Sequence, residues 1–298
     1  MTRRRWHRRR GGRAAAALAF LLFVGCGSAE PPREARPAMW LVADPDTRIY
    51  LLGTMHALPR GTDWDGGKVA EAMRAADALV MELSPDELAA AGAVFGQLAP
   101  RSAPLAIDRR LSGEALGGYR RLEAKGGDFG GDRLDDWAVM VLMGQRTAAL
   151  AKLSPDAGVE AGLTAAFRDA DKPIGGLETA KAQLLLFETL PPEAQRTLLE
   201  RAASRADSAP REVGALADAW SRGDVAALEA VINADVEAVP AARKAILTDR
   251  NRRWSAWVKR RMDRPGTLLV AVGAGHLIGP EGVPALLEAD GLTVTRVQ

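Results

Sequence analysis

The amino-acid sequence predicts an α/β fold: a mixed β-sheet with flanking helices and a helical insertion. Short apolar runs alternate with segments of helical periodicity, which is typical of this class. Most of residues 85–153 and 179–262 has helical patterns, which indicates the insertion. The two ends of the chain also share one local order, strand, Gly-x-x-His, helix, strand, and this order indicates a pseudo-two-fold relation between them.

The first 38 residues precede the expected fold. Seven arginines stand before the apolar run AAAALAFLLFVG, which ends at Cys26. This order predicts a signal peptide over residues 1–25, because the run is too short to span a membrane. The tail FVGC resembles a lipobox, so we expect Cys26 to be lipidated, with cleavage and release as the alternative. The Pro-rich residues 26–38 predict a flexible tether, and a single domain is expected over 39–298.

These features predict an exported lipoprotein, periplasmic and attached to a membrane by its lipid. Gly27 and Ser28 follow the cysteine without an aspartate, which favours the outer membrane. The whole chain has 40 basic and 38 acidic residues, a net charge of +2. Without the seven leader arginines, 33 basic residues face 38 acidic ones, so no nucleic-acid partner is expected. Cys26 is the only cysteine, which excludes a disulfide or a thiolate metal site.

The elements follow in order from residue 39. A β-hairpin is predicted from MWLVAD, the turn PDT and RIYLLG. A helix in GKVAEAMRAA and a buried strand in DALVMELS come next. The clearest helix of the insertion is LDDWAVMVLMGQRTAALAKL, apolar on nearly all sides and therefore central. After it come a helix in GVEAGLTAAFRDA, a strand in KPIGGLE, further helices, and finally TLLVAVG (strand), GAGH (turn), EGVPALLEADG (helix) and LTVTRVQ (strand).

Four predicted strands end in a residue that can bind a metal or move a proton: His56, Glu82, Glu178 and His276. Ligands of open α/β sheets collect at the carboxyl ends of strands. A glycine, Gly53 or Gly273, precedes each histidine by three residues, and glycine permits positive φ and close backbone approach. Two histidines with one or two carboxylates suit a divalent metal with an open position for water. The alternatives are structural: hydrogen-bonded histidines and a Glu178 that caps the next helix. Glu160, ahead of another helix, is a weaker candidate.

Polar side chains interrupt the apolar face of the helix predicted in AILTDRNRRWSAWVKRRM. Arg250 is four residues from both Ile246 and Trp254, and Asn251 is four residues from Leu247, so both fall on the buried face. A buried arginine must be paired. A site carboxylate, an anionic substrate group or an ordinary salt bridge would provide the partner.

Taken together, these segments resemble the TraB/PrgY/GumN family. The similarity covers Met39 to Gln298 and is carried by GTMH, the acid of VMEL, GVE, KPIGGLET with QLLLF, the RNRRW helix and VGAGHLIGPEGVPALLEADGLTVTRV. Members resemble the Tiki membrane-anchored metalloproteases and, more distantly, erythromycin esterases and a haem-binding lipoprotein group. The resemblance implies that His56, His276 and Glu82 form the core of a divalent-metal hydrolase site. No HExxH helix is present, so the site would differ from that of the zincins.

A metal-dependent hydrolase, most simply a peptidase, is the leading hypothesis. His56, His276 and a carboxylate, Glu82 or Glu178, hold zinc, manganese or cobalt, and the ion lowers the pKa of bound water toward ~7. The other carboxylate acts as general base, and Arg250 faces a peptide or small-molecule substrate. The second hypothesis is a non-catalytic lipoprotein that binds haem or a metal. The third is a metal-free esterase with one histidine as base.

Overall fold

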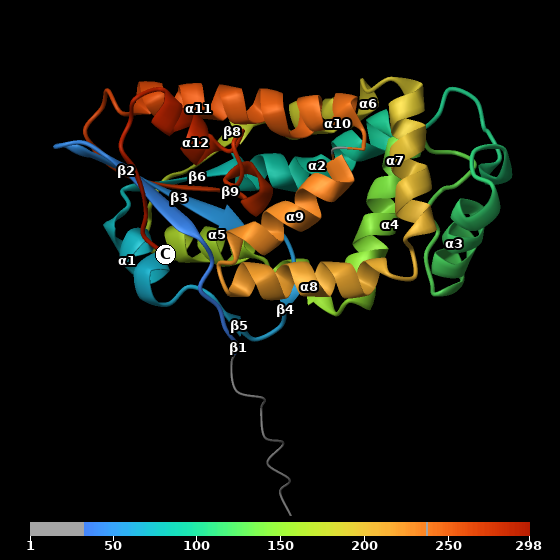
Figure 1. Ribbon diagram of the computed structural model, residues 1–298, viewed down its shortest axis with the longest axis horizontal. Helices are drawn as coiled ribbons and strands as arrows, with labels where there is room; N and C mark the ends of the chain where they lie inside the picture. The colour runs from blue at the N-terminus through green and yellow to red at the C-terminus, as the bar shows by residue number, and fades with distance from the viewer. Residues whose placement is uncertain (1–32, 237) are drawn as a thin grey trace, which may run out of the picture. The chain divides into compact units, whose positions relative to one another are not determined.

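A mixed six-stranded β-sheet forms the centre of the computed structural model, which describes residues 33–236 and 238–298 (Figure 1). Its strand order is β10-β2-β3-β9-β6-β8. The bounds are β2 Met39–Ala43, β3 Thr47–Thr54, β6 Ala78–Leu83, β8 Ile174–Glu178, β9 Gly266–Gly273 and β10 Val294–Arg296. β2 is antiparallel to β3 and β10, whereas β3, β9, β6 and β8 are parallel. The predicted α/β class with a mixed sheet is confirmed.

The predicted N-terminal hairpin is formed by β2 and β3. The Asp44 carboxylate closes its turn by accepting the backbone N–H groups of Asp46 and Thr47. β3 then runs parallel to β9 along its whole length. Apart from the exposed Arg48 near the start of β3, both strands are mainly apolar and largely buried, as expected for strands covered on both faces of a sheet.

Helices cover both faces of this sheet. On one face, α1 (Gly67–Ala75) and α5 (Val159–Asp169) pack on a core that includes Leu52. On the other, α11 (Asp249–Arg261) and α12 (Val283–Ala289) pack on a core that includes Leu51. Successive side chains of a strand point to opposite faces, which is why these two neighbours belong to different cores. The units at the two chain ends, β3–α1–β6 and β9–α12–β10, thus contribute to one three-layer domain.

The helical insertion extends beyond one end of the sheet (Figure 1). Its helices are α2 Pro85–Leu98, α3 Gly113–Ala124, α4 Asp136–Leu150, α6 Ala180–Glu188, α7 Pro192–Ser204, α8 Ala209–Ser221, α9 Val225–Val236 and α10 Pro240–Arg243. α4 is central among them, as its apolar composition predicted. Its Trp137 is fully buried between Phe95 of α2 and Phe187 of α6, with ring centroids 5.3 and 6.3 Å away.

Residues before Met39 already form part of the domain, whereas the sequence predicted that the domain begins at Met39. Residues Arg33–Glu34 form β1, which pairs with β5 (Thr62–Asp63). Ala35 is buried, and the backbone N–H of Arg36 donates to the carbonyl of Ser221. The signal peptide expected over residues 1–25, Cys26 and the start of the expected tether lie outside the described residues. A second short pair joins β4 (Leu58–Pro59) to β7 (Leu153–Ser154).

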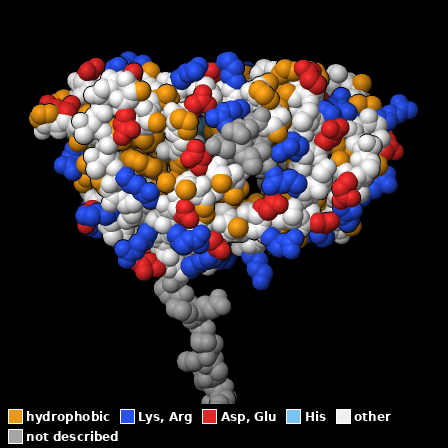
Figure 2. Space-filling view, in the orientation of Figure 1, with side chains coloured by type: hydrophobic (Ala, Val, Ile, Leu, Met, Phe, Trp, Pro, Cys, Tyr) orange, Lys and Arg blue, Asp and Glu red, His pale blue; other side chains and the backbone are white. Residues whose placement is uncertain are grey.

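The surface drawn in Figure 2 carries both signs of charge. Basic and acidic side chains are interspersed over this face, with small groups of apolar side chains between them. Over residues 33–236 and 238–298, no helix combines the length and the apolar character needed to cross a membrane.

Candidate functional site

Four adjacent parallel strands deliver the residues predicted at strand ends. β3, β9, β6 and β8 lie side by side and lead, in that order, to His56, His276, Glu82 and Glu178. The strand registers align these ends, because Thr54 pairs with Gly273 and Leu83 pairs with Glu178. The sheet therefore brings all four residues to its carboxyl edge.

The glycine before each histidine permits close packing. A Cβ on Gly53 would lie 3.2 Å from both Cα and Cβ of Ala274, and a Cβ on Gly273 would lie 3.2 Å from Glu82 Oε1. The N–H of Gly273 donates to that same oxygen at 2.8 Å. Neither glycine has positive φ, so of the two properties that glycine offers, these positions use close approach.

Asn251 of α11 fixes the tautomer of His276. Its Nδ2 donates to the carbonyl of Glu281 at 2.8 Å, so its Oδ1 faces His276 Nδ1 at 2.6 Å. Because an amide oxygen only accepts, Nδ1 carries the proton and Nε2 presents a lone pair. The ring is 5% exposed, and burial lowers the pKa of His276 to about 3; Glu82 opposes this shift and Arg250 reinforces it. The imidazole is therefore neutral at pH 7.

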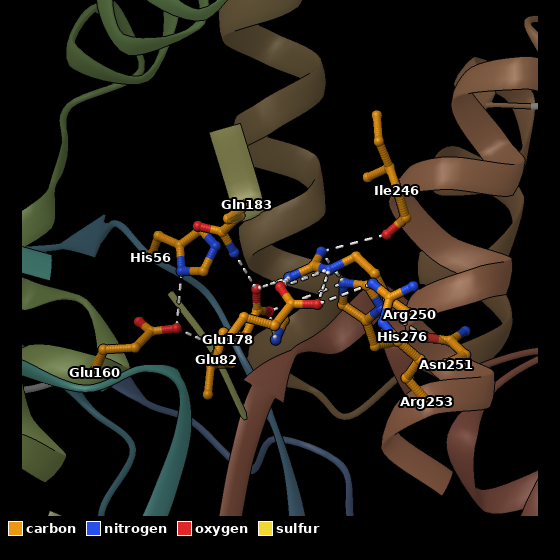
Figure 3. Close-up of polar contacts among 12 residues, drawn as sticks. His56, Glu82, Glu160, Glu178, Gln183, Ile246, Arg250, Asn251, Arg253 and His276 are labelled. Carbon is orange, nitrogen blue, oxygen red and sulfur yellow. Dashed lines mark hydrogen bonds and ion pairs between the residues drawn. The ribbon is translucent and has the colours of Figure 1, made fainter. Parts of the chain in front are cut away.

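The guanidinium of Arg250 lies between His276 and the two carboxylates (Figure 3). Its Nη1 donates to His276 Nε2 at 2.9 Å and its Nη2 to Glu82 Oε2 at 2.5 Å. Its Nε donates to Glu178 Oε2 at 3.0 Å, and Cζ lies 4.5 Å from the centroid of the Trp254 ring. The residue is only 4% exposed. The buried arginine predicted from helical spacing is thus paired with site carboxylates and does not point to solvent.

Glu82 accepts hydrogen bonds from three different residues. Besides Arg250 and the Gly273 N–H, it accepts a hydrogen bond from Gln183 Nε2 of α6 at 2.8 Å. Burial raises the pKa of Glu82, but the proximity of His276 and Arg250 outweighs burial and holds it below its usual range. Glu82 is therefore ionised. Gln183 was not predicted as a site residue.

His56 lies across the carboxylates from His276 (Figure 3). Its Nδ1 is 2.8 Å from Glu160 Oε1, and that oxygen also accepts from Thr54 Oγ1 at 2.5 Å. The charge of Glu160 is the main reason why the pKa of His56 rises to about 9. The His56 side chain is 72% exposed. Among the described residues none bonds its Nε2, but with a pKa of about 9 the ring is protonated at pH 7, so a metal would have to displace the proton from this nitrogen.

The segment Gly158-Val159-Glu160, which caps and begins α5, explains the position of Glu160. A Cβ on Gly158 would lie 2.2 Å from the carbonyl oxygen of His56, and the Val159 N–H donates to the carbonyl of Met55 at 3.1 Å. α5 therefore begins directly against the His56 loop and delivers Glu160 to the imidazole. Glu160 was only a weaker candidate in the sequence analysis, and its partner His56 lies 104 residues away, where no local pattern reveals it.

The donor chemistry of the site suits a divalent metal. Each imidazole is held at Nδ1 by a side-chain oxygen and keeps Nε2 as the potential ligand, an arrangement common to metal-binding histidines. Glu82 Oε1 lies 3.9 Å from His276 Nε2. Within the described residues, no three His, Cys, Asp or Glu side chains are close enough to hold an ion as they stand. Arg250 lies among the donors.

Two cavities elsewhere in the domain are separate from this site. One of about 510 Å³ lies between α4, α7 and α8, and one of about 250 Å³ lies between α1 and α5. None of the strand-end residues lines either cavity. Neither provides the apolar slot beside an axial histidine that haem would require.

Comparison with known proteins agrees with the resemblance noted in the sequence. The family model of the TraB/PrgY/gumN family matches residues 38–296, which include every site residue described above. No curated protein and no solved structure matches the chain. The chain therefore belongs to the TraB/PrgY/gumN family.

Proposed function

We propose that this chain is a metal-dependent hydrolase, with peptides as its first substrate class. The observation that carries the proposal is that both histidines have a side-chain oxygen hydrogen-bonded to Nδ1. Glu160 contacts Nδ1 of His56, and Asn251 contacts Nδ1 of His276. In both rings Nε2 is left as the nitrogen that could bind a metal, and both rings lie at one edge of the sheet. Partners of this kind set the tautomer and orientation of metal-binding histidines.

His56, His276 and Glu82 would hold the ion. A bound divalent ion polarises a carbonyl and lowers the pKa of its water. Glu82 suits the ligand role because it is ionised and its Oε1 lies on the side of His276 Nε2. Gln183 and the Gly273 N–H orient the same carboxylate.

Glu178 has a different environment. It accepts from Arg250 and from the exposed Arg253, the latter at 3.3 Å. Its carboxylate holds the Arg250 guanidinium over the site. Because Glu82 and Glu178 are both paired with Arg250, either one acts as a general base only after that guanidinium moves.

The test is cleavage of a peptide pool by the purified full chain, followed by mass spectrometry. Chelation should abolish cleavage, and zinc, manganese or cobalt should restore it. His56→Ala and His276→Ala should each be inactive, and the double variant should be no worse than either, because the ligands act as a unit. Cleavage that persists after chelation and in the double variant would refute the proposal.

A metal-free hydrolase is the second candidate, and the exposed His56–Glu160 pair favours it. An accessible imidazole oriented by a carboxylate is a general acid–base arrangement. This function predicts turnover that survives chelation and His276→Gln but is lost in His56→Ala. The same peptide pool, extended with simple esters, separates the two candidates.

We also propose that the domain is exported and anchored to a membrane through lipidated Cys26. The support is the order of the leader, with arginines, a short apolar run and FVGC. The outer membrane is favoured because no aspartate follows the cysteine.

A further inference from the structure

Arg250 contacts three of the groups that a metal would need. Its Nη1 donates to His276 Nε2, its Nη2 to Glu82, and its Nε to Glu178. One imidazole nitrogen and two carboxylates also form a donor set that divalent ions bind. The guanidinium therefore satisfies, with one positive charge, the same lone pairs that an ion would take.

Occupation by the guanidinium and by an ion is mutually exclusive at His276. Asn251 fixes the proton on Nδ1, so Nε2 has a single lone pair, and Arg250 Nη1 donates to it at 2.9 Å. A metal bound to Nε2 has to displace that N–H. The two cations would also repel each other, and burial weakens the solvent screening between them.

The local backbone allows the guanidinium to leave His276 without losing all its partners. Arg250 follows the π-helical turn Lys244–Thr248, a distortion found frequently at functional sites. Nη1 also bonds the carbonyl of Ile246 within this turn, at 3.3 Å. Rotation of the end of the side chain breaks the contact with His276, while Nε keeps Glu178.

We propose that Arg250 is a built-in competitor for the metal, so that the site alternates between an arginine-held and a metal-held state. The inference rests on the proposed metal-dependent function. In the arginine-held state the guanidinium pairs with both carboxylates and blocks His276 Nε2. Metal binding displaces the guanidinium from His276 and Glu82, and its freed N–H groups can then meet an anionic group of the substrate. Arg250 thereby sets the metal affinity of the site.

Zinc affinity, measured by competition with a chromophoric chelator, tests this exchange. Arg250→Met in the full chain should bind zinc on the order of 10-fold or more tightly than the parent, within the usual range of site-to-site coupling. Arg253→Met is the matched control: it lies on the same helix and contacts Glu178, but it is exposed. Its zinc affinity should equal that of the parent.

Thermal unfolding gives a second measurement. Arg250→Met leaves Glu82 and Glu178 without their main cation, so it should melt below the parent without metal, and zinc should raise its Tm more than that of the parent. Should this variant fail to fold, Arg250→Lys replaces it. One ammonium cannot span three acceptors, so the Arg250→Lys protein should also bind zinc more tightly than the parent.

The outcomes separate the two proposals. If the parent binds zinc and the Arg250 variants bind it with equal or lower affinity, the exchange is overturned but the proposed metal site is not. Absence of zinc binding in the parent and in both Arg250 variants overturns the metal site and the exchange together. Tighter binding that is specific to the Arg250 variants supports both.

Discussion

Glu160→Gln should lower the pKa of His56 by at least about one pH unit. The substitution keeps the shape of the side chain and removes the charge that mainly raises this pKa from 6.5 to about 9. At about 1.4 kcal/mol per pH unit, the full difference sets an upper bound of roughly 3–4 kcal/mol on the interaction. The imidazole is 72% exposed, so solvent screens the pair and the measured effect should be smaller.

The assay is an NMR titration of the histidine rings with chelator present. His56 and His276 are the two histidines of the described residues and His7 is the third in the sequence, so His7→Gln and His56→Gln together assign all three signals. The parent should show a His56 midpoint clearly above 6.5 and no higher than about 9, and His276 should not titrate between pH 5 and 9. Glu71→Gln, an exposed carboxylate paired with Lys68, is the control. A His56 midpoint near 6.5 that Glu160→Gln leaves unchanged would refute the reasoning.

Other outcomes follow from the same contacts. The folded-state pKa of His276 is depressed, so its contribution to stability is present above pH 6.5 and is lost as the pH falls toward 3. The free energy of unfolding from urea titration should therefore drop by roughly 1–2 kcal/mol between pH 6.5 and 5, and by less in His276→Gln. Asn251→Leu leaves the His276 Nδ1–H and a backbone carbonyl unpaired, so urea titration should show a loss of about 2–4 kcal/mol, which Asn251→Asp should partly avoid. Gly158→Ala places a Cβ 2.2 Å from the His56 carbonyl oxygen and should cost about 1–3 kcal/mol, measured as a lower Tm. Cys26→Ala should move the protein from the membrane pellet to the soluble fraction, and unchanged membrane association would contradict lipid anchoring.

The location of four candidate residues at the carboxyl edge of the sheet could be predicted because the relevant sequence signals are local. Apolar runs ended by His56, Glu82, Glu178 and His276 located the strands, and the parallel order of β3, β9, β6 and β8 then placed their ends together. Helical spacing likewise predicted that Arg250 is buried, because the period of an α-helix assigns each residue to a face.

Contacts between distant segments could not be predicted in the same way. Glu160 meets His56 across 104 residues, and Gln183 meets Glu82 across 101, so no local pattern links them. Helical spacing also left the partner of Arg250 open among three alternatives. Strand order was equally inaccessible, because periodicity identifies a strand without identifying its neighbours.

An anomalous difference map from a zinc-soaked crystal of the chain tests the central claim most directly. We predict a single strong peak about 2.0–2.1 Å from Nε2 of both His56 and His276, with Glu82 as a further ligand. The Arg250 guanidinium should have left His276 in the same crystal. A map without a peak at these three residues, with Arg250 still bonded to His276 Nε2 at saturating zinc, would contradict the account.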